Sequence, residues 1–198
     1  MNRIVDRGAI TAAYVGIGMA LTIVVSFMLF IPIEWIIWVL ALPSGLLIGY
    51  YANQRSDRRR GPWGRILVNG LFAGIVTGLT AAALLFAIKA LFFYADNGFR
   101  DPGLGGQVTV VKDDGRPAAC QPGADCVYQR YLQAGRGHDL EAVGVTDVSS
   151  FTAFYWKEQV GSSMTVLLIT AVGGVGGAAL YGAFRPKPVT MEAGSPAA

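Results

Sequence analysis

The residues that could carry chemistry are few, and most lie between residues 97 and 150. Cys120 and Cys126, in CQPGADC, are the only cysteines, and the single histidine, His138, stands close to Asp139 and Glu141 in GHDLEA. Structural metal sites usually take about four protein ligands, so this sparse set favours a solvated loop over a metal site. The cysteines predict a disulfide, which persists in an oxidising compartment.

Motifs of catalysis and cofactor binding are missing from the sequence. It contains no phosphate-binding glycine loop with its lysine, no HExxH, no nucleophile elbow and no Cys-x-x-Cys. GGVGG at 173–177 has the glycine content of a phosphate loop but lies inside an apolar run. With one histidine, general acid–base chemistry is hard to assemble. We therefore expect a protein that is not an enzyme and binds no cofactor.

The elements that hold these residues are mostly membrane-spanning helices. Of 198 residues, 53% are hydrophobic and 15% charged, and the mean hydropathy is +0.46. Crossing the hydrocarbon core takes about 20 apolar residues in helical form. Four runs predict an all-α integral membrane protein, with spans at about 9–31, 35–51, 66–94 and 164–184. The first resembles a signal peptide, but its length and the absence of a cleavage site favour an uncleaved span.

These spans divide the chain into four parts. Residues 1–94 hold the first three spans, 95–159 a small extracytoplasmic segment with an interfacial helix, 160–185 the fourth span, and 186–198 a disordered tail.

The distribution of Lys and Arg predicts the orientation. Nine basic residues flank the side that holds both termini: Arg3, Arg7, Arg55, Arg58, Arg59, Arg60, Arg65, Arg185 and Lys187. The segment between the third and fourth spans carries more acids than bases. Both termini are therefore expected in the cytoplasm, with the protein in the cell membrane.

The basic run RSDRRRGPWGR has two interpretations. It acts as a topology anchor, which we favour, or it binds lipid headgroups, acidic partners or nucleic acid. No folded basic module with aromatic platforms accompanies it, so we expect no nucleic-acid partner. Trp63, Tyr50 and Tyr51 are expected in a cytoplasmic aromatic belt. An outer belt is expected from Trp35, Trp38, Phe92, Phe93, Tyr94, Phe154, Tyr155 and Trp156.

Small residues recur every four positions in every span, a pattern typical of a glycine zipper. The helix-packing positions expected from it are Gly16, Gly45, Gly49, Gly70, Gly74, Gly78, Gly174 and Gly182. Small residues let helices approach closely in lipid, where the hydrophobic effect does not drive association. We favour a tightly packed intramolecular bundle. The alternatives are a homo-oligomer and a glycine-lined conduction pathway. GIGMALT (16–22) and GIVTGLT (74–80) resemble each other weakly, and we favour similar composition over duplication.

Ionisable residues within spans usually mark transport pathways, and here they are nearly missing. Lys89 and Glu34 both fall near the outer interface, where separate solvated ends are favoured over an ion pair. Asn69 falls near the cytoplasmic end. Pro43 is expected to kink the second span.

The segment between the third and fourth spans is the largest soluble part. QVTVVKDDG and EAVGVTDV predict short strands, and CVYQRYLQ predicts a helical turn or two. Ser149 and Ser150 are expected to cap a helix that begins at Phe151, and Gly161 to separate this interfacial helix from the last span.

These features favour a non-catalytic accessory, assembly or scaffold subunit. Its partners would be the lipid bilayer and a membrane protein or a second copy of itself. The alternative is a small transporter or channel, lined by the glycine-striped helices.

Overall fold

The computed structural model describes residues 4–30, 35–56, 62–96, 109–111 and 117–184. Helix α1 (Arg7–Val25) continues as a π-helical turn, Ser26–Phe30, and is followed by α2 (Trp35–Arg55), α3 (Trp63–Ala95) and, after the soluble segment, α6 (Val148–Ala183). Each of the four is long and apolar enough to cross a membrane. They pack closely against one another, which confirms the predicted all-α four-span bundle.

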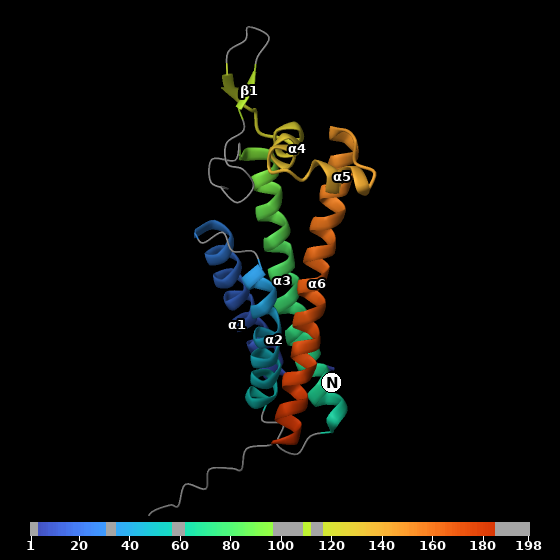
Figure 1. Cartoon of the computed structure of the whole chain (residues 1–198). Helices are drawn as coiled ribbons and strands as arrows, with labels where there is room; N and C mark the ends of the chain where they lie inside the picture. Colours follow the sequence, from blue (N-terminus) through green and yellow to red (C-terminus); the bar gives the residue numbers. More distant parts are fainter. Residues whose placement is uncertain (1–3, 31–34, 57–61, 97–108, 112–116, 185–198) are drawn as a thin grey trace, which may run out of the picture.

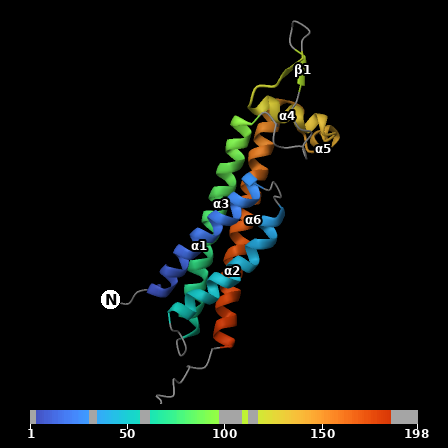
Figure 2. The same cartoon turned by 90° about the vertical axis from the view of Figure 1, so that its left-hand side faces the viewer.

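The helices differ in length, and the difference shapes the molecule. At 1.5 Å per residue, the 33 residues of α3 and the 36 of α6 span about 50 Å, well beyond a hydrocarbon core of about 30 Å. Figures 1 and 2 show α3 and α6 continuing side by side past the end of α1. We call that end of the molecule the head and the opposite end, where α1 begins and α6 ends, the base.

The head also contains β1 (Thr109–Val111), β2 (Pro117–Ala119), α4 (Ala124–Gln133) and α5 (Gly137–Ala142). The predicted first strand and the helix over CVYQRYLQ are confirmed. The second predicted strand is wrong, since β1 pairs antiparallel with β2, with Thr109 opposite Ala119. Glu141 and Ala142 end α5 instead. Gly144 follows with a φ of +80°, a left-handed conformation that suits glycine and turns the chain away from a strand.

Helix α6 begins earlier than expected and does not break. Asp147 is the N-cap residue: its side chain accepts a hydrogen bond from the Ser150 backbone N–H, and the Ser150 hydroxyl accepts one from the Asp147 N–H. This reciprocal capping box satisfies two backbone donors of the first turn. The cap is therefore Asp147, with Ser150 as its partner three residues on. The helix runs unbroken through Gly161, where the sequence suggested a separation.

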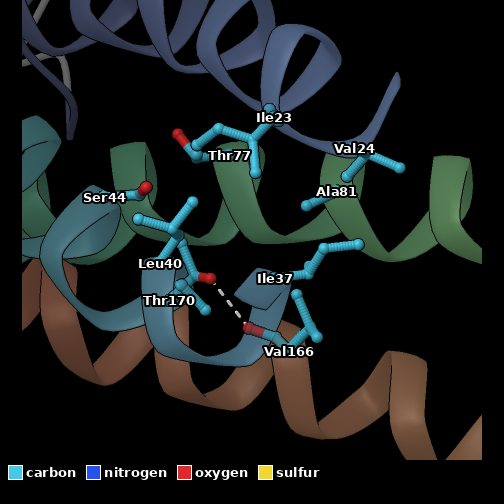
Figure 3. A pocket seen from close by; sticks show the side chains of 11 residues that line it. Ile23, Val24, Ile37, Leu40, Ser44, Thr77, Ala81, Val166 and Thr170 are labelled. Atoms are coloured by element: carbon cyan, nitrogen blue, oxygen red, sulfur yellow. Dashed lines mark hydrogen bonds between the residues drawn. The ribbon is translucent and has the colours of Figure 1, made fainter. Parts of the chain in front are cut away.

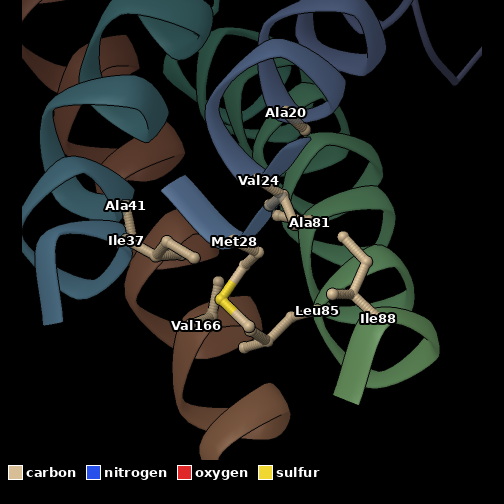
Figure 4. Close-up of a cluster of buried hydrophobic side chains, with 9 residues drawn as sticks. All are labelled: Ala20, Val24, Met28, Ile37, Ala41, Ala81, Leu85, Ile88 and Val166. Carbon is tan, nitrogen blue, oxygen red and sulfur yellow. The ribbon is translucent and has the colours of Figure 1, made fainter. Parts of the chain in front are cut away.

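The centre of the bundle is apolar. Met28, in the π-helical turn that follows α1, belongs to a cluster of buried side chains from all four long helices, which includes Ile37, Leu85, Ile88 and Val166 (Figure 4). Since Met28 lies level with Ile88 and Val166, the parts of α3 and α6 on the head side of these residues extend beyond α1. Pro43 lies inside α2 and leaves the carbonyl of Val39 without its helical donor.

Candidate functional site

The glycines of α3 pack against α6. A Cβ atom added to Gly74 would lie 2.9 Å from the carbonyl oxygen of Thr170, and one added to Gly78 would lie 3.0 Å from the Cβ of Thr170. A Cβ on Gly70 would meet Ala178 and the Gly174 carbonyl. The three glycines of α3 that the sequence predicts as packing positions therefore lie where the backbones of α3 and α6 come close together.

The glycines of α2 face the same helix from another side. A Cβ on Gly45 would meet the Thr170 carbonyl and Gly173, and one on Gly49 would meet the Gly174 carbonyl. Gly174 therefore lies between α2 and α3, which both cross α6 at this level.

The remaining two expected packing positions touch side chains. A Cβ on Gly16 of α1 would clash with Thr77 of α3, and one on Gly182 would lie 2.5 Å from the ring of Trp63. All eight glycines expected at helix contacts thus face another helix of the same chain.

A buried polar cluster ties three helices together at the base. Asn69 of α3 donates from Nδ2 to the Asp6 carboxylate at 2.7 Å and to Asn53 Oδ1 of α2 at 3.4 Å, and its Oδ1 accepts from the Asp6 N–H at 3.1 Å. Asn53 Nδ2 donates to the carbonyls of Gly49 (3.1 Å) and Ile66 (3.0 Å). Both asparagines are fully buried.

Each asparagine side chain in this cluster makes a hydrogen bond to another helix, so the cluster joins α2, α3 and the start of α1. Sequence reasoning placed Asn69 near the helix end but missed Asn53 and Asp6. The sequence feature that could have revealed this cluster is the presence of two asparagines, each within an apolar helix, together with an aspartate just before α1. Buried polar groups need partners, so amides at such positions predict contact with one another.

The head has a core of its own, built around Phe151. Its ring lies 5.1 Å from the ring centroids of both Tyr128 and Tyr131 on α4 and 6.1 Å from that of Tyr155. Phe93 of α3 continues the series, 4.7 Å from Tyr155. Val127, Leu140 and Val145 complete the cluster. Aromatic pairs at these separations stabilise beyond their area alone.

This arrangement corrects part of the expected outer belt. Phe93 and Tyr155 are buried in the head core, 1% and 7% exposed, and do not face outward. Tyr94 and Trp35 are exposed, at 63% and 66%, as residues of a belt would be. The sequence could not separate the two groups, because both are aromatic residues near a helix end.

An ion pair fixes α4 to the end of α3. Arg130 is 4% exposed, and its guanidinium lies 3.7 Å from the carboxylate of Asp96, the C-cap residue of α3. The guanidinium of Arg136, the N-cap residue of α5, lies 4.6 Å from the centroid of the Tyr131 ring on α4, a cation–π distance. The ion pair thus links α4 to α3, and the cation–π contact links α4 to the start of α5.

Cys120 and Cys126 are paired as a disulfide, with Cα atoms 5.4 Å apart. Both are buried. The bond joins the residue after β2 to the first turn of α4, which fixes the hairpin to the head core.

His138, Asp139 and Glu141 lie exposed on α5. Among the described residues, no three of His, Cys, Asp and Glu gather where they could hold a metal ion. At the start of α6, hydrogen bonds from the Ser150 backbone and hydroxyl lower the pKa of Asp147 below its usual value, because they stabilise the carboxylate. Glu34, the cluster Arg58 to Arg60 and the tail 185–198 lie outside the described residues.

A small cavity of about 20 Å³, room for about one water molecule, lies at the middle of the bundle (Figure 3). All four long helices line it. Its lining is apolar except for the hydroxyl-bearing residues Ser44, Thr77 and Thr170.

Comparison of the chain with protein-family models, with curated proteins and with solved structures gives no match.

Proposed function

We propose that the protein is a non-catalytic accessory or scaffold subunit of the cell membrane, whose head binds a partner protein on the extracytoplasmic side. The observation that carries this proposal is the head itself. It has a separate aromatic core and a disulfide, and it is raised on the extended ends of α3 and α6.

The packing of the glycine stripes favours the head, rather than the glycine-lined faces of the bundle, as the surface that binds a partner. Gly70, Gly74, Gly78 and Gly174 are covered by other helices of the chain, so these faces are not available to a second protein. The head exposes apolar side chains at Leu132 and Val143, which are 36% and 59% exposed.

Sidedness follows from charge. The basic residues near the base favour a cytoplasmic position for that end, and the disulfide suits a head in an oxidising compartment. The alternative, a small transporter or channel, receives less support, because the centre of the bundle is apolar and the glycine-striped faces are in close contact.

Site-specific photo-crosslinking in cells tests the proposal. A photoreactive phenylalanine at Val143 of the head is expected to give a discrete adduct with another protein. The same residue at Leu168, an exposed residue in the middle of α6, serves as the matched control and is expected to give lipid adducts only. Purified protein in liposomes is expected to conduct no ions. A protein adduct at Leu168 but not at Val143, or ion flux through the purified protein, would overturn the scaffold assignment.

A further inference from the structure

We propose that the base binds an anionic phospholipid of the leaflet that it meets, through Arg7, Arg55 and Arg65. This lipid and the proposed partner of the head are independent of each other, since they would bind at opposite ends of the molecule.

Three helix ends bring these arginines together at the base, where α1 begins (Figure 2). A Cβ added to Gly8 would lie 2.5 Å from the backbone carbonyl carbon of Arg55, so the end of α2 touches the start of α1 beside Arg7. On α3, Asn69 lies one turn along the helix from Arg65 and is hydrogen-bonded to the residue just before Arg7. The three arginines therefore lie around the start of α1, each on a different helix.

The charges of this group are accessible. Arg7 and Arg55 are exposed, and Arg65 is half-buried. Within the part of the chain that the structure describes, no ion pair joins any of the three to a carboxylate. Asp6 is the one acid among the described residues at the base, and its carboxylate accepts a hydrogen bond from Asn69 Nδ2 at 2.7 Å. Three cations and one acid leave the group with a net positive charge.

The surface next to the arginines is apolar, which favours a lipid over a soluble anion. On α1, Ile10 and Tyr14 follow Arg7 by three and seven residues and are exposed. On α3, the exposed Val68 follows Arg65 by three residues. Residues at these spacings share one face of a helix. Each face thus offers a cation to a phosphate group and, toward the middle of the bilayer, apolar side chains to an acyl chain.

The arginines also lie at the depth of lipid headgroups, because α1 begins at Arg7 and α2 ends at Arg55. Trp63, the first residue of α3, is half exposed at the same end, and tryptophan is enriched at membrane–water interfaces. A guanidinium group can donate two parallel hydrogen bonds to one phosphate. Each arginine near an anionic membrane surface strengthens binding by about fivefold.

The test uses the full chain in detergent micelles with equal amounts of phosphatidylglycerol and phosphatidylcholine that carry the same acyl chains. Native mass spectrometry measures how much of each lipid stays bound. We expect the protein to retain phosphatidylglycerol in preference, because only this headgroup carries a net negative charge. Equal retention of the two lipids by the wild-type protein would overturn the proposal.

A charge-matched pair of variants locates the site. Arg7→Gln/Arg65→Gln should weaken the binding of phosphatidylglycerol by about thirtyfold and leave that of phosphatidylcholine unchanged. Arg136→Gln/Lys157→Gln removes two charges from the head and should bind both lipids as the wild type does. Residues 58–60 are the same in both variants, so any attraction of lipid by that basic run is equal. Arg65→Gln alone, with an expected loss of about fivefold, serves if the double variant loses its helical circular dichroism.

Two further results would contradict the proposal. The first is a preference for phosphatidylglycerol that persists in the folded base variant or falls equally in the head variant. The second is displacement of the lipid by glycerol phosphate in large molar excess, which would identify a site for a soluble anion. We expect glycerol phosphate to displace no lipid, because it has no acyl chain to contact the apolar faces of α1 and α3.

Discussion

The same substitution at two positions of α6 is expected to change stability in opposite directions. Gly174 lies between two helices: an added Cβ would meet the Gly70 carbonyl and would lie 2.9 Å from the Cα of Gly74. Both neighbours are backbone atoms, which cannot rotate away. At Gly161, nothing lies within 4 Å of an added Cβ.

The magnitudes follow from two opposing terms. Alanine stabilises a helix over glycine by about 1 kcal/mol, and this gain applies at both sites. Overpacking a close contact costs about 1–3 kcal/mol, and the backbone contacts at Gly174 place it near the upper value. Gly161→Ala should therefore raise the free energy of unfolding by up to about 1 kcal/mol, and Gly174→Ala should lower it by about 1–2 kcal/mol.

Unfolding in mixed micelles with increasing denaturing detergent, followed by circular dichroism, measures both values in one background. Gly18→Ala, on α1, is a second control, since its added Cβ would also meet nothing within 4 Å. If Gly174→Ala were as stable as Gly161→Ala, the helices would not be in backbone contact at Gly174, and the packing described here would be wrong.

Three further outcomes are expected. Asn69→Leu should lower the free energy of unfolding by about 1–3 kcal/mol, because the Asp6 N–H and carboxylate lose their hydrogen bonds to Asn69; wild-type stability in detergent denaturation would contradict this. Phe151→Ala should lower the local stability of the head by about 3–5 kcal/mol, so that amide hydrogens of α4 exchange faster while those of α2 exchange at the wild-type rate. An equal increase of the exchange rate in α4 and α2 would show that the head has no separate core. Because the folded pKa of Asp147 is lowered, its contribution to stability is present above the unfolded value near 3.8 and is lost as pH falls through the folded pKa. Amide protection in the first turn of α6 should fall in that acidic range in the wild type but not in Asp147→Asn, which keeps an uncharged cap; identical acid profiles would refute the capping role.

The four spans and their glycine contacts could be predicted from the sequence because both depend on local pattern. Apolar length specifies a span, and small residues every four positions specify the face that packs. The partner of each face could not be predicted: Gly174 contacts both α2 and α3, and nothing in its own helix indicates this.

The head was harder to predict, because its structure depends on contacts between distant residues. Phe93 and Tyr155 pack together across 62 positions of sequence, so their aromatic character alone suggested a membrane belt. The continuity of α6 was also missed. Gly161 weakens a helix by about 1 kcal/mol, which the packed turns on either side outweigh.

The measurement that tests the account most directly is cysteine accessibility in intact cells, with single cysteines placed at Val143 in the head and at Arg58 in the basic run, on a background with Cys120 and Cys126 replaced by serine. A membrane-impermeant maleimide is expected to label the cysteine at 143 in intact cells, and the one at 58 only after the cells are opened. Labelling of both from the same side would contradict a head that faces away from the cytoplasm and, with it, the partner that we propose for the head.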